Sequence, residues 1–266
     1  MECFTVYAEQ IEKRIDPFYY KPEFVKFHEK ISRSKFKFKE ISQIAKVICG
    51  PFGSAITVKD YKTEGVPLIR ISNIEEDHLS KEDIKFISKE QSLKLKQYIV
   101  KKGDLIISQR GTLGLVVKID ESFDGAVMSA NFIAIKDLQE ISPDLLQILL
   151  SAQIGQIQLL RKTSGQVQTK ITTDDIKTIT IPVLPEKIQI EIMDKIKKAY
   201  IYKKKKELEA QQQLDSINIH ILDELGIKLP DLNEKLIYPV YSDETKDGRL
   251  DPRYYKSYFI EFEKEL

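Results

Sequence analysis

The feature that most constrains this chain is the stretch of residues 186–225, which contains neither proline nor glycine. Gly226 and Pro230, residues of the kinds that end helices, follow it directly. A continuous helix of this length would be about 60 Å long, which exceeds the helices of ordinary globular domains. The stretch therefore predicts a long helix of the coiled-coil type, and we assign residues 185–228 to a spacer or dimerisation helix.

Apolar residues follow a heptad register only at the two ends of this stretch. The segment KKKKELEAQQQ, residues 203–213, places lysine and glutamine on the same seam in the middle. Two interpretations stay open: a solvated stretch of one long helix, or a spacer between two packed ends, which we favour. The residues expected at the helix interface are Ile192, Ile196, Ala199, Ile217 and Ile221.

Residues 37–184 have a different pattern, in which short runs of β-branched residues alternate with glycine-containing turns. Val66–Ile74, Gly103–Ser108, Leu115–Ile119 and Ala126–Lys136 each predict a strand. A helix is expected to begin at Ser142-Pro143, a cap followed by proline in the first turn. The sequence thus predicts an α+β fold: a mixed, twisted β-sheet domain over 37–184, followed by a protruding coiled-coil-type helix.

The composition of the 266-residue chain restricts the possible classes of function. Lys and Arg number 42 and Asp and Glu 41, so the net charge indicates no particular partner, although a neutral total can hide a basic face. Two distant cysteines and three scattered histidines predict neither a disulfide framework nor a metal site. The apolar runs are too short to span a membrane, and we expect a cytoplasmic protein. No arrangement of catalytic residues stands out.

One sequence motif occurs near both ends of the chain. RIDPFYYKPEFVKF, residues 14–27, matches RLDPRYYKSYFIEF, residues 249–262, at eight positions. A repeat with so long a period indicates one whole module followed by the start of a second. We therefore expect residues 1–36 to pack on the module and residues 229–266 to begin a second, truncated copy. The tyrosine pairs Tyr19-Tyr20 and Tyr254-Tyr255 are expected to pack within the protein rather than to stack on bases.

Five short motifs, taken in order, carry a family resemblance. They are PFGS (Pro51–Ser54), GVPLIRISNI (Gly65–Ile74), KKGDLIISQRGTLG (Lys101–Gly114), SGQVQTKI (Ser164–Ile171) and IPVLPEKIQIEI (Ile181–Ile192). Each is weak alone, but in this order and followed by a long helix the set resembles the specificity subunit of type I restriction-modification systems. The resemblance covers about residues 37–228. It departs at the end, where that family usually has a second recognition domain.

The resemblance implies a non-catalytic, sequence-specific DNA recognition subunit that reads one half of a bipartite target. The helix would set the distance to a second recognition domain and dock methyltransferase subunits, which would bring S-adenosylmethionine; this chain itself would need no cofactor. The restriction subunit is a further candidate partner. With one module, the chain is either a natural half-length subunit, expected to form a homodimer through its helix, or a fragment of a longer one.

Two alternatives to this function remain open: a coiled-coil assembly adaptor that binds protein, and the DNA-reading portion of a fused restriction-modification enzyme. Arginine, asparagine and glutamine read base edges, and cations hold phosphates, so loop residues of these types are our candidates. For Arg70 the structural alternative is a carboxylate pair, and for Gln166 and Gln168 it is loop hydrogen bonding. The expected DNA-binding residues are Lys59, Tyr61, Arg70, Asn73, Gln109, Arg110, Thr112, Gln166, Gln168 and Lys170.

Overall fold

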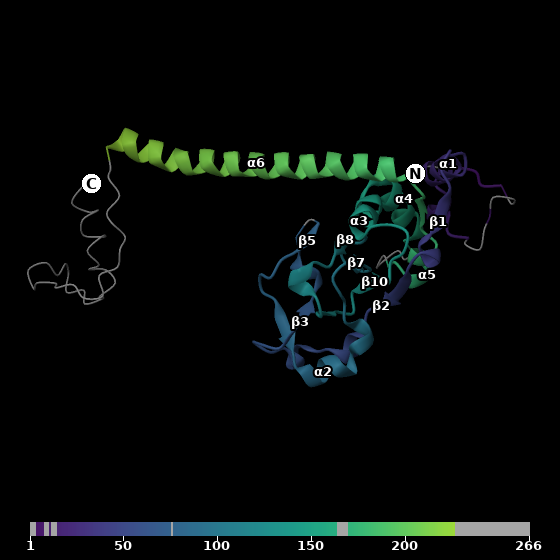
Figure 1. The fold of residues 1–266 in the computed structure, drawn as a ribbon, viewed down its shortest axis with the longest axis horizontal. Coiled ribbons are helices and arrows are strands. Elements are labelled where there is room, and N and C mark those ends of the chain that lie inside the picture. Colours follow the sequence, from purple (N-terminus) through teal and green to yellow (C-terminus); the bar gives the residue numbers. More distant parts are fainter. Residues whose placement is uncertain (1–3, 8–10, 12–14, 76, 164–169, 227–266) are drawn as a thin grey trace, which may run out of the picture. The chain divides into compact units, whose positions relative to one another are not determined.

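The computed structural model describes residues 4–7, 11, 15–75, 77–163 and 170–226 (Figure 1). The chain divides into two compact units, Met1–Glu191 and Ile192–Leu266, and each is described by itself. Small mixed sheets and short helices build the first unit, and one long helix supplies the described part of the second. The predicted α+β class is therefore confirmed. In the described residues, no helix combines the length and apolarity that crossing a membrane requires.

A four-stranded antiparallel sheet forms the centre of the first unit. Its strands lie in the order β2 (Lys46–Cys49), β10 (Phe132–Lys136), β7 (Leu105–Ser108) and β8 (Val116–Lys118). Every residue of β7 is buried, as expected for an apolar run that is covered on both faces. This sheet is the framework on which the loops of the candidate site are mounted.

A second sheet has the order β6 (Lys85–Ile87), β3 (Val66–Ile69) and β9 (Val127–Met128). Strands β3 and β6 are antiparallel, whereas β3 and β9 are parallel. Buried apolar residues of both sheets belong to one core cluster, which includes Ile69, Ile106 and Phe132. The two sheets are thus held together by shared packing.

Two predicted strands prove to be interrupted, and each interruption has a physical cause. The run Val66–Ile74 forms β3 only as far as Ile69, because residues 71–73 make a 3-10 turn before the short strand β4 (Ile74–Glu75), which pairs with β5 (His78–Leu79). The run Ala126–Lys136 is split into β9 and β10, because the chain passes from one sheet to the other at residues 129–131.

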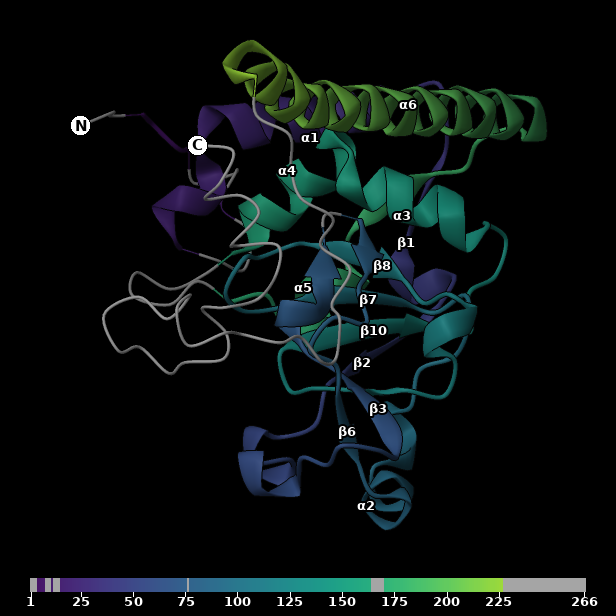
Figure 2. The same cartoon turned by 90° about the vertical axis from the view of Figure 1, so that its left-hand side faces the viewer.

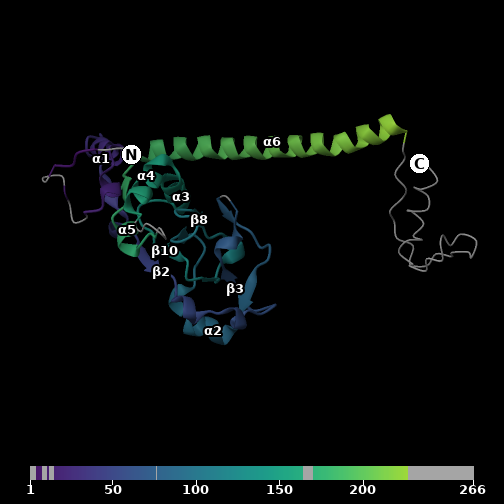
Figure 3. The same cartoon turned by 180° about the vertical axis from the view of Figure 1, so that it is seen from behind.

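Helices cover the two ends of the first unit (Figure 3). The predicted start at Ser142 is confirmed, since its hydroxyl accepts the Leu145 N–H at 3.2 Å and caps α3 (Pro143–Ser151). Helix α3 packs beside β8 and is followed by α4 (Gln153–Lys162), as Figure 2 shows. Helix α2 (Lys89–Lys94) lies at the opposite end.

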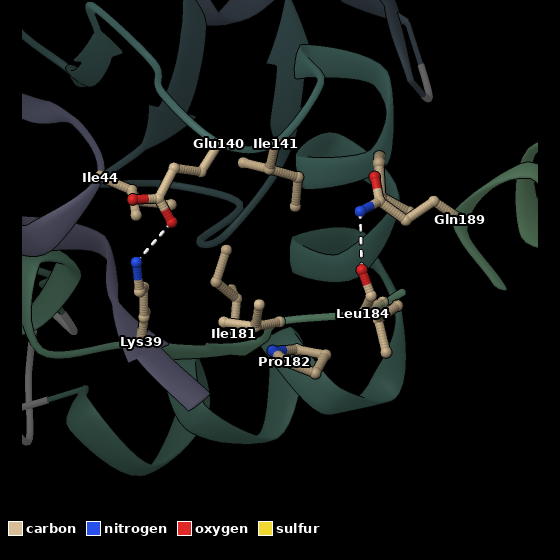
Figure 4. A pocket seen from close by; sticks show the side chains of 10 residues that line it. Lys39, Ile44, Glu140, Ile141, Ile181, Pro182, Leu184 and Gln189 are labelled. Carbon is tan, nitrogen blue, oxygen red and sulfur yellow. Dashed lines mark hydrogen bonds and ion pairs between the residues drawn. The ribbon is translucent and has the colours of Figure 1, made fainter. Parts of the chain in front are cut away.

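The first and last strands of this unit pair with each other. Strand β1 (Phe38–Glu40) is antiparallel to β11 (Thr180–Pro182), which follows the short helix α5 (Thr173–Lys177). Figure 4 shows a small cavity of about 30 Å³ beside this pair, with the Lys39–Glu140 ion pair on one side. On the other side the Gln189 side chain donates to the Leu184 carbonyl at 2.8 Å and fixes the first turns of the long helix.

The N-terminal copy of the repeated motif packs against α4. Asp16 accepts the Phe18 N–H at 3.0 Å and caps the 3-10 turn Pro17–Tyr20, which leads into α1 (Pro22–Ser32). Tyr19 and Tyr20 are buried, as expected for residues that pack rather than stack on bases. Tyr254 and Tyr255 lie outside the described residues.

The long helix α6 runs from Glu186 to Leu225, in agreement with the predicted stretch. Of the expected interface residues, Ile192 and Ile196 are half-buried and Ala199 is exposed. Ile217 and Ile221 are 50% and 49% exposed. The C-terminal part of α6 therefore presents apolar side chains that nothing in the described part of the chain buries.

Candidate nucleic-acid interface

A groove of about 690 Å³ opens where the loops after β2, β3 and β7 meet the connection between β9 and β10. It lies within the first unit and gathers residues that are far apart in the sequence. Five of the ten predicted DNA-binding residues line it: Tyr61, Arg70, Gln109, Arg110 and Lys170. Among the described residues that line the groove there are three cations and no carboxylate. Its lining therefore favours an anionic ligand.

The Arg70 side chain lies at the wall of this groove and is held in place by three contacts. Its Nη2 atom donates to the Asp83 carbonyl at 2.6 Å and to the Asp83 carboxylate at 3.0 Å. Its guanidinium lies 5.8 Å from the centroid of the Tyr61 ring. Hydrogen bonds from Lys85 and Arg70 hold the pKa of the Asp83 carboxyl below its usual value, so this carboxylate stays charged. The carboxylate pair considered from the sequence is thus present, and Arg70 still lines the groove.

Asn73 and Gln109 have structural positions that the sequence did not indicate. The Asn73 side chain is fully buried; its Oδ1 accepts the Arg70 N–H at 3.1 Å and its Nδ2 donates to the Glu82 carbonyl at 3.1 Å. Gln109 is 3% exposed, and its Nε2 donates to the Ala130 carbonyl at 2.6 Å. Both amides hydrogen-bond to backbone groups that fix the loops of the groove, and their contact with a base edge stays a prediction.

Arg110 and Lys170 are the exposed cations of the groove. Neither side chain makes a hydrogen bond or an ion pair with any described residue. Gly111 and Gly114, with φ angles of +77° and +74°, form the turn that follows Arg110, a conformation that favours glycine. These two cations are therefore free to contact a phosphate or a base.

Two further predicted residues, Lys59 and Thr112, lie outside the groove. Lys59 is exposed on the 3-10 turn Val58–Asp60, and Thr112 is exposed in the β7–β8 loop; neither lines the groove. Gln166 and Gln168 lie outside the described residues. In the described part of the chain, no group of His, Cys, Asp and Glu is arranged to hold a metal ion.

Phe52, Ser129 and Asn131 are among the groove residues that the sequence reasoning missed. Phe52 is 85% exposed in the loop after β2, and Asn131 is exposed in the β9–β10 connection. The position of Phe52 between Pro51 and Gly53, two residues typical of turns, was a signal that its side chain would be exposed in a loop. No local signal marks Ser129 or Asn131, because their position depends on the chain crossing between two sheets.

Comparisons with known proteins place the chain in a family. Residues 33–212 match the family model described as the type I restriction modification DNA specificity domain. The chain is 23% identical over 155 residues to the type I restriction enzyme EcoBI specificity subunit of Escherichia coli, covering 58% of this chain and 33% of that protein. It is 24% identical over 164 residues to the EcoKI specificity subunit of Escherichia coli strain K12, covering 58% and 34%.

The fold is also similar to that of a solved structure. A chain from a study of complex assembly and conformational transition in the type I R-M system matches with a TM-score of 0.54 and 17% sequence identity, over 76% of this chain and 50% of that one. The present chain spans about a third of the length of the two curated relatives. Because the family model matches well over half of its residues, the chain belongs to the family of type I restriction-modification DNA specificity domains.

Proposed function

We propose that this chain is a non-catalytic subunit that recognises a DNA sequence for a type I restriction-modification system. The observation that carries the proposal is the groove, whose described lining contains Arg70, Arg110 and Lys170 and no carboxylate. Cations hold phosphates, while Arg and Asn side chains read base edges. Family membership supports the same role.

The described part of the chain carries one such groove, which would read one half of a bipartite target. Helix α6 sets the distance to a second recognition domain. It also docks methyltransferase subunits, which supply S-adenosylmethionine and perform the chemistry, and the restriction subunit is a further partner of the assembled complex. This role places the protein in the cytoplasm with its DNA.

The exposed apolar residues at the C-terminal end of α6 support a homodimer. Ile217 and Ile221 are four residues apart and lie on the same side of the helix, and each side chain is about half exposed. A second copy of the helix would cover them. A two-fold dimer would then read a palindromic pair of half-sites at fixed spacing.

The test of DNA binding is the salt dependence of affinity for random-sequence duplexes. Each phosphate contact releases counterions, so we expect the affinity of the full chain to fall by about tenfold or more between about 50 mM and about 200 mM salt. No measurable affinity at the lower salt concentration would refute the proposal and favour the coiled-coil adaptor that binds protein.

Selection of duplexes from a random library tests sequence recognition separately. A single enriched motif is expected for a recognition subunit. Salt-dependent binding without any enriched motif would show that the protein binds DNA without recognising a sequence, and would refute the recognition role.

A further inference from the structure

Phe52 is the most exposed large apolar residue that lines the groove. Its side chain is 85% exposed, whereas the neighbouring Pro51 is buried. Single exposed apolar side chains are common on protein surfaces, so exposure alone assigns no role. The position of Phe52 among the groove cations Arg70, Arg110 and Lys170 is what requires an explanation.

The loop that carries Phe52 is pinned to the protein on both sides. Before it, the Gly50 N–H donates to the Phe132 carbonyl at 2.8 Å, and a Cβ at Gly50 would lie 2.4 Å from the Ser129 carbonyl oxygen. After it, the Ala55 N–H donates to the Phe52 carbonyl at 2.8 Å, and the Gln91 side chain donates to the Ala55 carbonyl at 2.8 Å. The ring is therefore presented to solvent by a fixed backbone, so little conformational entropy is lost when it binds.

A phenyl ring cannot hold a phosphate, so in a DNA groove it contacts apolar surface: a sugar, the face of an unstacked base, or an apolar group on a base edge. The only apolar group on a base edge in the major groove is the C5-methyl group of thymine, and phenylalanine is one of the side chains that contact it. The cations that line the same groove would supply the phosphate contacts that hold a duplex there.

We propose that Phe52 is a specificity-determining residue that reads a thymine through its C5-methyl group. This inference rests on the proposed DNA-recognition function and adds to it an uncharged contact. An apolar protein partner for the exposed ring is the competing explanation, and the experiment below separates the two.

The experiment is a double-mutant cycle in which one change is made in the protein and the other in the DNA. All 266 residues of the chain are used. Wild type first enriches a duplex from a random-sequence library. Each thymine of the enriched duplex is then replaced singly by uracil, which removes only the methyl group. Affinities of wild type, Phe52→Ala and the control Leu93→Ala are measured on all duplexes. Leu93 is 69% exposed on α2 and does not line the groove.

For wild type we expect one thymine whose replacement by uracil weakens binding about fourfold, as burial of one methyl group predicts. Phe52→Ala should bind the enriched duplex about tenfold more weakly and lose the response to that uracil. Its salt dependence should match that of wild type, because no charge is removed. Leu93→Ala should behave as wild type on every duplex, and thermal unfolding confirms that each variant is folded.

Three results would overturn the inference while leaving the proposed function in place. In the first, no replacement of thymine by uracil weakens the binding of wild type. In the second, Phe52→Ala still loses affinity when the same thymine is replaced. In the third, Phe52→Ala loses as much affinity for random duplexes as for the enriched duplex. Unchanged DNA affinity of Phe52→Ala would assign the ring to a protein partner. Failure of wild type to enrich any duplex would overturn the recognition function itself, and the role of Phe52 with it.

Discussion

The guanidinium of Arg161 lies 3.9 Å from the centroid of the Tyr19 ring, and its Nε donates to the Tyr19 carbonyl at 3.1 Å. This contact joins the N-terminal motif to α4 across 142 residues of sequence. Arg161 is only 9% exposed, and this ring and this carbonyl contribute to stabilising its charge. It gives the first copy of the repeated motif a structural role.

We expect Arg161→Ala to lower the free energy of unfolding by about 2–3 kcal/mol, because it removes a buried cation–π contact and a charged hydrogen bond. Urea unfolding of the full chain measures the change. The control Lys177→Ala removes an exposed cation whose ion pair with Asp174 contributes little. Equal stabilities of the two variants would show that the motif does not depend on Arg161.

The two free cations of the groove should contribute to DNA binding through charge. We expect the double variant Arg110→Ala/Lys170→Ala to bind random duplexes more weakly and to lower the slope of log affinity against log salt by about two. Neither side chain has a partner among the described residues, so stability should be unchanged. The double control Lys81→Ala/Lys89→Ala removes two exposed cations outside the groove and should keep the wild-type slope.

Gly50 and Gly53 flank Phe52 and offer a matched pair of substitutions. A Cβ at Gly50 would lie 2.4 Å from the Ser129 carbonyl oxygen, whereas one at Gly53 would have no atom within 4 Å. Gly50→Ala should therefore lower the free energy of unfolding by about 1–3 kcal/mol, as overpacking does, and weaken DNA binding by moving the loop. Gly53→Ala should leave the free energy of unfolding unchanged. Equal effects of the two substitutions on unfolding would contradict this account of the loop.

Asp104 should make stability depend on pH. Burial raises the pKa of its carboxyl above the ordinary value of 3.8, although the Lys101 N–H donates to it at 2.9 Å. A raised pKa in the folded state means that stability is fully present below the unfolded value and is lost as pH rises through the folded one.

The isosteric variant Asp104→Asn cannot ionise, so its stability relative to wild type should increase from acid to neutral pH. Urea unfolding of both proteins on either side of the ordinary carboxyl pKa measures this difference. A relative stability that decreases as pH rises would show that the charged form of Asp104 is favoured by folding.

The exposed end of α6 predicts the oligomeric state. We expect light scattering to show a dimer for wild type at micromolar concentration, and a monomer for Ile217→Glu/Ile221→Glu, because charges replace the apolar contact surface. The control Gln212→Glu adds a charge to an exposed position on the side of the same helix away from Ile217 and Ile221, and should remain a dimer. A wild-type monomer would refute the homodimer without affecting the proposal of DNA recognition.

The parts of the fold that were predictable from the sequence are those with local signals. Helix α6 was predictable because no proline or glycine interrupts residues 186–225 and Gly226 follows them. Strand β7 was predictable from its run of apolar residues, and the start of α3 from the Ser142-Pro143 cap. The interruptions at Arg70 and at Ser129 were not, since each depends on where the chain meets another strand.

Only part of the candidate site was predictable, because residue type does not reveal the direction of a side chain. Arg70 and Arg110 were recognised as rare cations near glycine and asparagine. Asn73 and Gln109 have the residue types that read adenine, yet both are buried and bonded to backbone groups. Phe52 joins the groove only because Gly50 packs against the β9–β10 connection, a contact between distant segments.

The pairing of β1 with β11 brings Phe38 opposite Pro182, so the proposed DNA-reading domain, residues 38–182, begins and ends at one place. A domain whose ends are adjacent can be excised and replaced by another of the same family without altering the path of the chain outside it. Recombination at these two strands would therefore exchange the target sequence of a restriction system in one step and leave the helix that follows to assemble as before.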